Sequence, residues 1–522
     1  MDSTKDAYAF SAEGKDSDTA AVSTITGSGV YNIVGDIRAA DGGILTLDLA
    51  EGSRFEGKAV LDSGNDSQST LTMAKNSLWT LTGNSQLNSL QNEQSVIDMT
   101  GDNKAFSTLS VETLTGNGGT IIMDIDGSQV DASDKIYVTG DFSGSHTLSL
   151  KEINGLDSDP GIGQAAENTV LASVNGSGTF TADDQEGTLY WQRYELGQKD
   201  SAASGYTTDW YLKGITNLNL PTTSVEAIAA SGALAYHTWR DHDQLLQRLG
   251  DLRQHGREEE GVWVRVKGGK LSRSDQFEFE NKYTQYELGY DQKLKSTPAY
   301  TRYAGISFSY FDGDSSYSSG SGENKVKALN IYGTQIGAKG HYLDLVLKYS
   351  QLDNDFKVFD TSGNKITGDY DQNGLSISAE YGRKNNLKNN WYIEPQAQLT
   401  FGRLRGTDYT TSNGIRVDQD GIDSFVGRIG FNICKDINEK TNIYLKANLM
   451  HEFGGGYNAS MVDAGGTKAR LDRDFDDTWF EYGLGAAVQT GKNNYFYVDV
   501  ERSAGSDYKK DWQWNVGARW SF

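Results

Sequence analysis

Apolar and polar residues alternate without a break along residues 511–522, which read DWQWNVGARWSF. Successive side chains of an extended strand point to opposite faces, so this pattern separates an apolar face from a polar one. The apolar face is formed by Trp512, Trp514, Val516, Ala518, Trp520 and Phe522. In a soluble sandwich such a face packs against a second sheet. Here it is aromatic at both ends, a pattern typical of a strand whose apolar side meets lipid.

Eleven earlier segments between residues 260 and 522 show the same alternation. The twelve segments begin near Val262, Tyr283, Tyr300, Val326, Tyr342, Leu375, Trp391, Phe425, Ile443, Trp479, Tyr495 and Trp512. Each is about ten residues long, the length that a tilted strand needs to cross a bilayer. We expect the polar faces to line the lumen of a barrel, because a Lys or Arg on the lipid face near mid-bilayer costs about 2–4 kcal/mol.

The connections between these segments are alternately short and long. The short ones lie near residues 292–298, 337–340, 384–390, 435–441 and 490–494, and the longer polar ones near 272–281, 312–323, 352–372, 403–421, 454–477 and 502–510. This alternation is typical of the periplasmic turns and extracellular loops of a membrane barrel. Both ends of the barrel are then periplasmic, and a segment that precedes it can reach the outside only through the pore.

After Pro221 the period of the pattern changes from two to 3.6. Thr223 and Glu226 form a capping-box pattern for a helix start, and Gly250 is predicted to end the helix. One helical stripe is formed by Val225, Ile228, Gly232, Ala235, Trp239, His242, Leu246 and Leu249. A slim helix with charges on its other faces suits a water-lined barrel interior. A linker helix on the surface is equally consistent with this pattern alone.

Residues 1 to about 220 contain short strand-like runs separated by turns rich in Gly, Asn and Asp. The runs include Ile44–Leu49, Ser69–Met73, Leu78–Leu81 and Gln94–Met99. Repeated short strands without a long helical pattern favour a β-solenoid, in which each rung buries its face on the next. A β-sandwich is the alternative. The stretch Leu189–Leu212 is predicted to form two amphipathic strands and the last rung.

Composition narrows the class of protein. Of the 522 residues 37% are hydrophobic, and no apolar run reaches about 18 residues, so no transmembrane helix is expected. The 60 glycines and 4 prolines suit a strand-rich chain with tight turns. A formal net charge of −23 argues against nucleic acid as a partner, because binding to a phosphate backbone requires a basic surface.

Two further features bear on export. Cys434 is the single cysteine, which excludes an internal disulfide framework. The first residues, MDSTKDAYAF, lack the basic and apolar regions of a signal peptide. An exported protein of this sequence is therefore expected to have lost its signal.

Candidate catalytic residues are few in the first half of the chain. His146 is its single histidine, and a Ser-His-Asp triad there would have to use it. We expect this histidine in a solvated turn between two strands. The acidic pairs Asp124/Asp126 and Asp157/Asp159 are likewise predicted to be solvated turn residues rather than cation sites.

Several motifs carry a family resemblance. Leu109–Gly118 and Asp134–Gly140 are similar to the rungs at the C-terminal end of pertactin-like passengers. In the second half, the matching motifs are Leu246–Arg253 (LQRLGDLR), Gly261–Lys270, Trp391–Phe401 and Arg519–Phe522. The chain thus resembles monomeric, pertactin-like autotransporters of type V secretion, strongly over roughly residues 106–522 and weakly before.

The resemblance implies an all-β fold in three parts. These are an N-terminal right-handed parallel β-helix (solenoid), a single pore-spanning α-helix and a C-terminal 12-stranded antiparallel transmembrane β-barrel. The implied domains are a β-helical passenger segment at 1–105, an autochaperone segment at 106–220, an α-helical linker in the barrel lumen at 221–255 and the translocator barrel at 256–522. The autochaperone segment would nucleate folding of the passenger and cap the solenoid.

The resemblance also bears on cleavage of the linker. In serine-protease autotransporters an Asn-Asn pair precedes the motif that LQRLGDLR resembles, and cyclisation of an Asn cuts the chain. Asp243 and Gln244 stand at these positions here, so cleavage by this route is not expected.

Two groups of side chains are predicted to matter for such a protein. Contacts between helix and lumen wall are expected from Arg240, Arg248, Asp251, Arg253, Glu380, Glu394, Arg428 and Arg519. Trp520 and Phe522 are expected to form the signal that the barrel-assembly machinery reads. A simple porin is disfavoured by the helix, and removal of the helix is expected to open the pore.

We therefore expect an outer-membrane protein whose barrel anchors and translocates its own adhesive or self-associating passenger. It is not expected to be an enzyme, and no catalytic residue, cofactor or metal is predicted. The expected partners are outer-membrane lipid, the barrel-assembly machinery, periplasmic chaperones, and a host surface or another copy of the chain, but not nucleic acid. The alternatives are an inert stalk or stub of a larger surface protein, and an outer-membrane enzyme with an unrecognised site.

Overall fold

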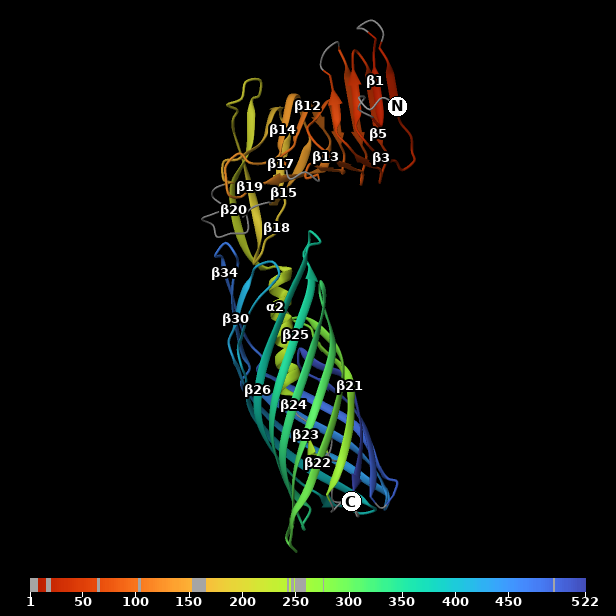
Figure 1. Ribbon diagram of the computed structural model, residues 1–522, viewed down its shortest axis with the longest axis vertical. Coiled ribbons are helices and arrows are strands. Elements are labelled where there is room, and N and C mark those ends of the chain that lie inside the picture. The colour runs from red at the N-terminus through yellow and green to blue at the C-terminus, as the bar shows by residue number, and fades with distance from the viewer. Residues whose placement is uncertain are drawn as a thin grey trace. The chain divides into compact units, whose positions relative to one another are not determined.

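The computed structural model describes residues 8–15, 20–62, 66–101, 105–152, 166–241, 244–245, 248, 260–275, 277–491 and 493–522. The chain divides into two compact units. The first comprises Met1–Leu220 with Ala464–Thr467, and the second comprises Pro221–Asp463 with Lys468–Phe522. Both units consist mostly of strands, and the helix α2 (Thr223–Arg240) lies near the start of the second (Figure 1). None of the described helices is long and apolar enough to cross a membrane.

The first unit is a β-solenoid with three sheets (Figure 1). The smallest holds β1 (Phe10–Glu13), β4 (Ile37–Ala40) and β7 (Ala59–Leu61). The second holds, in spatial order, β17 (Thr179–Ala182), β15 (Ser145–Glu152), β13 (Asn117–Ile125), β11 (Val96–Asp98), β9 (Leu78–Thr80), β6 (Arg54–Glu56) and β3 (Asn32–Val34). The third holds β18 (Gln185–Glu186), β19 (Tyr190–Asp200), β20 (Thr208–Pro221), β16 (Val170–Gly176), β14 (Lys135–Phe142), β12 (Thr108–Thr115), β10 (Ser85–Asn92), β8 (Gln68–Met73), β5 (Ile44–Leu49) and β2 (Val22–Ile25).

Apolar side chains stack from rung to rung inside this unit. The parallel register of the third sheet aligns Leu47, Leu71, Leu90, Leu114 and Phe142 on five successive strands, and all five are buried. A single rung cannot bury such a face alone, so each strand is stabilised by the next. At the C-terminal end of the stack, β20 pairs antiparallel with β16. The predicted solenoid is confirmed, and the sandwich alternative is not.

His146 is buried, so the prediction of a solvated turn is wrong. It is the second residue of β15, and its ring stacks on Phe142 with 5.8 Å between ring centroids, in a cluster that continues to Phe180. Only 1% of the residue is exposed, and burial lowers its pKa to about 4. The strand begins at Ser145, directly after the turn residue Gly144, so the alternation points the imidazole inward.

The acidic pair Asp124/Asp126 is also buried rather than solvated, which corrects a second prediction. Asp126 accepts hydrogen bonds from the backbone N–H and the hydroxyl of Ser128. Such partners offset the cost of burying a carboxylate, and the sequence alone did not reveal them. The second acidic pair, at 157–159, lies outside the described residues.

The second unit is a closed antiparallel barrel. Its wall strands, in order, are β21 (Gly261–Arg273), β22 (Phe279–Ser296), β23 (Tyr300–Tyr317), β24 (Gly320–Gly337), β25 (His341–Phe359), β26 (Lys365–Arg383), β28 (Trp391–Leu404), β31 (Ile422–Asn438), β32 (Thr441–Glu452), β35 (Asp477–Gln489), β36 (Asn494–Ala504) and β37 (Tyr508–Ser521). A short strand, β27 (Asn385–Asn386), pairs with β28. β21 pairs with β37 from Gly261↔Ser521 to Arg273↔Tyr508, which closes the wall. Each of the twelve predicted segments falls in one of these wall strands, so the predicted topology is confirmed.

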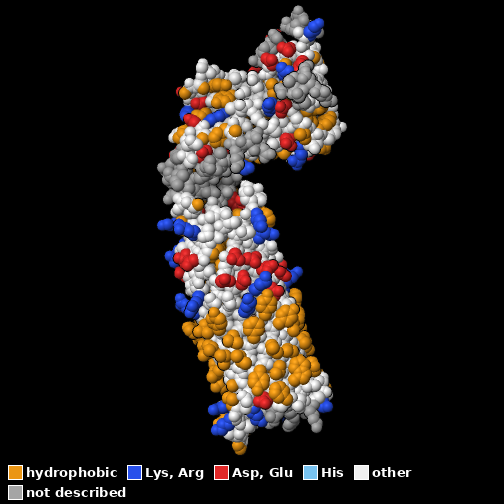
Figure 2. Space-filling view, in the orientation of Figure 1, with side chains coloured by type: hydrophobic (Ala, Val, Ile, Leu, Met, Phe, Trp, Pro, Cys, Tyr) orange, Lys and Arg blue, Asp and Glu red, His pale blue; other side chains and the backbone are white. Residues whose placement is uncertain are grey.

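Many wall strands are longer than the ten residues expected. β25 and β26 have 19 residues each. The outward side chains of β25 are apolar from Leu343 to Tyr349 and polar from Gln351 to Lys357, so the strand continues well beyond the apolar band. The predicted long loops 312–323 and 352–372 are therefore mostly strand. Figure 2 shows the apolar band on the outer wall, with acidic and basic side chains directly above it.

Two other predicted loops, 403–421 and 454–477, form a four-stranded antiparallel sheet. Its strands, in spatial order, are β29 (Thr407–Thr410), β30 (Arg416–Gln419), β33 (Gly456–Val462) and β34 (Lys468–Asp474). The sheet is held to the wall at Ser412, whose backbone N–H donates to the carbonyl of Thr367. We call this sheet, together with the parts of β22–β26 beyond the apolar band (residues 279–284, 312–327, 351–359 and 365–373), the collar.

Candidate functional site

α2 begins inside the collar. Asn413, in the turn between β29 and β30, donates a hydrogen bond of 3.0 Å to the hydroxyl of Ser224. About two helical turns further along α2, the hydroxyls of Ser231 and Tyr370 are 2.8 Å apart. Contacts from the four-stranded sheet and from β26 thus hold the first half of the helix (Figure 1).

The bounds of α2 differ from those predicted. Thr222 rather than Thr223 is the N-cap, and the helix ends at Arg240 instead of reaching Gly250. From its second turn on, α2 is buried on all sides, so it is not an amphipathic helix with a solvated face. At the end of the helix, Asp241 adopts an extended conformation, with φ −64° and ψ 120°, and its carboxylate is paired with lysines of distant wall strands.

Glycines allow close contact between α2 and its surroundings. A Cβ on Gly232 of the helix would overlap the ring of Tyr457 in the collar. A Cβ on Gly374 of β26 would overlap the indole of Trp239. Gly374 precedes Leu375, the uppermost apolar side chain on the outward face of β26, so the C-terminal turn of α2 lies at the upper edge of the apolar band.

Arg240, the last residue of α2, contacts a carboxylate and an aromatic ring. Its Nη1 lies 3.6 Å from Oε2 of Glu452, which also accepts a hydrogen bond of 2.7 Å from the hydroxyl of Tyr236. The guanidinium lies over the ring of Trp479, 4.6 Å from the centroid, within the range of a cation–π interaction. Arg240 and Glu452 are both buried, so their charges must compensate each other.

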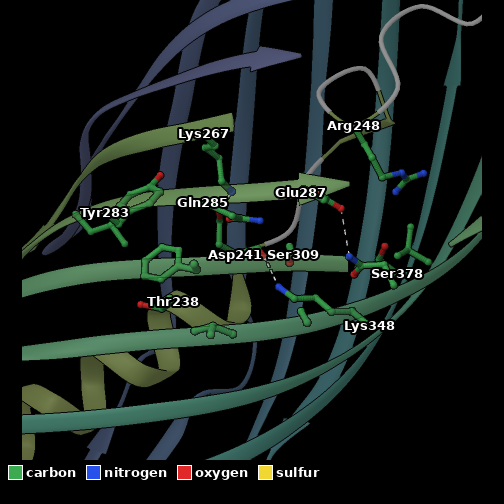
Figure 3. Close-up of a pocket in the computed structure, with 16 residues that line it drawn as sticks. Thr238, Asp241, Arg248, Lys267, Tyr283, Gln285, Glu287, Ser309, Lys348 and Ser378 are labelled. Atoms are coloured by element: carbon green, nitrogen blue, oxygen red, sulfur yellow. Dashed lines mark hydrogen bonds and ion pairs between the residues drawn. The ribbon is translucent and has the colours of Figure 1, made fainter. Parts of the chain in front are cut away.

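Asp241 follows the helix and contacts lysines from three strands. Its carboxylate lies 3.0 Å from Nζ of Lys267 and 2.9 Å from Nζ of Lys510. Lys348 donates to the carbonyl of Asp241 at 3.1 Å and to that of Trp239 at 3.3 Å, two of the carbonyls that a helix leaves unpaired at its C-terminus. Figure 3 shows Asp241 and Lys348 at a cavity of about 50 Å³, which Lys267 and Arg248 also line.

The chain contacts the lumen again beyond Asp241. Nη2 of Arg248 lies 2.8 Å and 2.7 Å from the two carboxylate oxygens of Asp344, and the guanidinium lies over Tyr332 at 4.3 Å from the ring centroid. Leu245 packs against Trp263 and Tyr332 inside the barrel. Its backbone N–H donates to Glu380 at 2.9 Å.

These contacts trace the path of the chain through the barrel. α2 starts in the collar, and Leu245 and Arg248 lie within the lumen. Gly261, the first residue of β21, pairs with Ser521 at the far end of the wall. The chain of the second unit therefore enters the barrel at one end and joins its wall at the other.

The structure brings together some of the predicted contact residues. Arg240 and Arg248 contact the wall as described. Glu380 meets the linker through Leu245 and lies 3.2 Å from Arg428. Arg428 and Arg240 line a common cavity of about 30 Å³ beside the helix end.

For two other predicted residues, the partners that the structure describes belong to the wall. Glu394 accepts a hydrogen bond from Gln396, and Arg519 pairs with Asp291, so both have partners within the wall. Asp251 and Arg253 lie outside the described residues. Trp520 and Phe522 face outward at the end of the chain, 40% and 63% exposed. Their role in assembly stays a prediction.

Sequence reasoning missed most of the residues that hold the linker. They are Asp241, Lys267, Asp344, Lys348, Glu452 and Lys510. The wall residues among them occupy lumen-facing positions of the alternation, which is the one signal that the sequence offers. Which lumen-facing charge meets the linker depends on the tilt and stagger of the strands around the barrel, and the alternation does not contain that information.

Comparison with protein families gives matches to separate parts of the chain. The family model described as Autotransporter beta-domain matches residues 262–501, and the one described as Pertactin matches residues 87–214. The first match covers the barrel and the second the C-terminal half of the solenoid. The chain belongs to the autotransporters. This autotransporter is an outer-membrane protein with a surface-exposed passenger, the solenoid.

Relatives of this autotransporter align over most of the chain. The probable autotransporter YcgV of Escherichia coli K12 is 28% identical over 96% of this chain and 55% of its own length. The pertactin autotransporter of Bordetella bronchiseptica is 28% identical over 93% of this chain and 56% of its own length. The solved β domain of the Bordetella autotransporter BrkA is 27% identical, covers 51% of this chain and 100% of that structure, and has a TM-score of 0.44. The chain thus spans little more than half the length of the curated relatives it matches.

Some relatives are named as enzymes. The serine protease Pet autotransporter of Escherichia coli O44:H18 is 26% identical over 87% of this chain and 34% of its own length. The absence of enzymatic activity in this autotransporter therefore stays a prediction.

Proposed function

We propose that the barrel of this autotransporter anchors the chain in the outer membrane and carries the solenoid to the cell surface through its lumen. The path of the chain supports this proposal. α2 begins in the collar, Arg248 contacts Asp344 in the lumen, and Gly261 joins the wall at the opposite end. The collar is then extracellular, and a passenger that leaves on that side has crossed the membrane.

Insertion would depend on the barrel-assembly machinery and periplasmic chaperones as partners. Trp520 and Phe522 are exposed at the end of β37, the strand that closes the barrel against β21. An exposed aromatic strand end is accessible before closure, which is the property that a recognition signal requires.

For the passenger we propose adhesion or self-association rather than catalysis. The outer face of its largest sheet carries an aligned ladder of hydroxyl groups from Thr46, Thr70, Ser89 and Thr113, one from each rung. Such a ladder is a regular polar surface for a partner. A serine hydrolase needs an accessible base next to its nucleophile, whereas His146 is buried against Phe142.

Protease treatment of intact Gram-negative cells tests the delivery of the passenger. The chain, supplied with an export signal and with tags at both ends, should lose the N-terminal tag while the barrel resists digestion. Protection of both tags in an assembled, heat-modifiable barrel would overturn the proposal.

A second experiment tests adhesion separately. Cells that display the full chain should aggregate or bind host cells more than cells that display the barrel from Pro221 onward. Equal behaviour of the two would identify the passenger as an inert stalk and would leave delivery unaffected. Retention of a proteolytic or esterolytic activity after replacement of His146 would instead point to an unrecognised catalytic site.

A further inference from the structure

Three charged residues at and beyond the end of α2 that the structure describes each meet the opposite sign on the wall. Among the described residues from 237 to 248, the acidic and basic residues other than histidine are Arg240, Asp241 and Arg248. Arg240 faces Glu452, and Arg248 faces Asp344. Asp241 faces Lys267, Lys348 and Lys510. The wall thus presents an acidic, a basic and an acidic site in the order in which the chain passes them.

Two of these sites lie one above the other on a single strand. Lys348 and Asp344 both face the lumen from β25, four residues apart, and Lys348 lies nearer the collar. Asp241 meets the upper position and Arg248 the lower one. The order of the wall charges along the pore is therefore built into the strand itself and does not depend on loops.

We infer that this order of charges sets the register at which the linker comes to rest in the pore. The inference rests on the proposed function, because a chain that moves through the barrel needs a defined stopping position.

The reason lies in what a shift of the linker would do. Movement by one residue away from the collar would bring Arg240 toward Lys267, Lys348 and Lys510. Movement by one residue in the opposite direction would bring Asp241 toward Glu452. The side chains of Arg240, Lys267 and Lys510 are at most 7% exposed, and that of Glu452 is fully buried, so solvent screens these contacts little. Buried ion pairs add little net stability, but a wrong partner leaves buried charges uncompensated, and this is how such pairs give specificity.

Packing also resists a shift at particular positions. A shift would put Ser231 or Ala233 in the place of Gly232, where a Cβ would overlap the ring of Tyr457. Trp239 in the space above Gly374 resists a shift sterically. The charges add a free-energy penalty to a shifted linker. This penalty depends on the order of Arg240 and Asp241 along the chain and not on the size of their side chains.

A transposition of the two neighbouring charges tests the inference in the full chain displayed on cells. The variant Arg240→Asp with Asp241→Arg keeps the composition and net charge of the linker and reverses only the order. The register is read by a short thiol crosslinker between a cysteine at Asn413 and a cysteine at Thr223, Ser224 or Val225, in a Cys434→Ala background. The parent chain should crosslink mainly at position 224, whose side chain contacts Asn413.

In the transposed variant the yield at position 224 should fall at least about tenfold, with new crosslinks at 223 or 225, as the cost of uncompensated buried charges implies. Transposition of the wall charges as well, by Glu452→Lys with Lys267→Glu, should restore part of the yield at 224. The matched control is Glu226→Lys, a charge reversal at an exposed residue in the first turn of the same helix, which should leave the pattern unchanged.

An unchanged crosslink at position 224 in a transposed, heat-modifiable barrel would overturn the inference while the passenger stays on the surface and the proposed function stands. If the transposed chain does not assemble, Asp241→Asn removes one charge at nearly constant shape. That variant should lower the yield at 224 severalfold, and an unchanged yield would also overturn the inference. A parent chain that exposes no passenger would overturn the proposed function and the inference with it.

Discussion

Neighbouring strands of the solenoid point leucines inward, whereas neighbouring strands of the barrel point carboxylates, amides and a guanidinium inward. In the solenoid the register aligns Leu47, Leu71 and Leu90. In the barrel it aligns Asp344, Glu380, Gln398 and Arg428 across β25, β26, β28 and β31. Both regions alternate apolar and polar side chains. Water surrounds the solenoid, so its apolar side chains point inward, and lipid surrounds the barrel, so its apolar side chains point outward.

The two regions also differ in how they use charge. The 220 residues before Pro221 contain 31 acidic and 12 basic residues, and the rest of the chain contains 40 and 36. A surface in water tolerates an excess of one sign. A buried charge needs its opposite within reach, as in the pair of Arg248 with Asp344, so the barrel carries nearly equal numbers of both.

A charge placed inside the solenoid should have the largest effect on stability. Leu71→Asp buries an unpaired carboxylate between Leu47 and Leu90, and we expect the solenoid to lose more than about 4 kcal/mol of unfolding free energy. Thr70→Asp, on the outer face of the same strand, should change it by less than about 0.5 kcal/mol. Limited proteolysis of the displayed chain measures both. A protease-resistant Leu71→Asp solenoid would contradict the assigned inner face.

In the barrel the sensitive face is the outer one. Leu345→Arg places a guanidinium in the apolar band, and we expect it to cost about 2–4 kcal/mol. Gln351→Arg lies on the same face of β25 beyond the band and should cost about 0–1 kcal/mol. Urea unfolding in liposomes measures the two changes. Equal costs would mean that the apolar band is placed wrongly.

A fall in pH should lower the stability of the solenoid through His146. Burial lowers the pKa of His146 from 6.5 to about 4, so the unfolded chain binds the proton more tightly than the folded one. Its contribution to solenoid stability is complete above pH 6.5 and is lost as the pH falls toward 4, by up to about 3 kcal/mol.

His146→Phe should remove this acid sensitivity, because a phenyl ring can stack on Phe142 and does not titrate. Hydrogen exchange of the β14 and β15 amides at pH 4.5 and 7.5, corrected for intrinsic rates, measures the effect in the full chain. The same loss in the variant as in the parent would assign the acid sensitivity to other groups.

The smallest expected effect concerns the contact between linker and wall. Gly374→Ala places a methyl group against the indole of Trp239, and we expect α2 to lose about 1–3 kcal/mol of local stability through overpacking. Gly333→Ala on β24 is the control, because the nearest atom to its new Cβ is 3.9 Å away. Hydrogen exchange of the α2 amides reports both. Equal protection of α2 in the two variants would show that Trp239 can move without cost.

The positions of the barrel strands could be predicted from the sequence, but their lengths could not. The alternation is local, and it marks each strand where one face is apolar. On β25 the outward face becomes polar at Gln351 while the inward face continues through Leu352 and Phe356. A pattern of outward apolar residues therefore predicts that the strand ends at that point. The strand continues because its inward side chains pack against other parts of the collar.

The candidate site was less accessible to sequence reasoning. The pattern pointed to Arg240 and Arg248 as linker contacts, but not to their partners Glu452 and Asp344, which lie far along the chain. The end of the helix at Arg240 was missed for a related reason. Local residues favour continuation to Gly250, and the lysines that hold Asp241 outside the helix come from distant strands.

The hydrogen bonds between successive rungs run along the axis of the solenoid, because its strands are stacked in parallel register. A pull on the far end of the passenger therefore loads one pair of rungs at a time, and a stack of nearest-neighbour units lengthens step by step under tension. Each wall strand of the barrel is hydrogen-bonded on both sides, so we expect the wall to stay assembled under the same force. The passenger would then lengthen before the membrane anchor is disrupted.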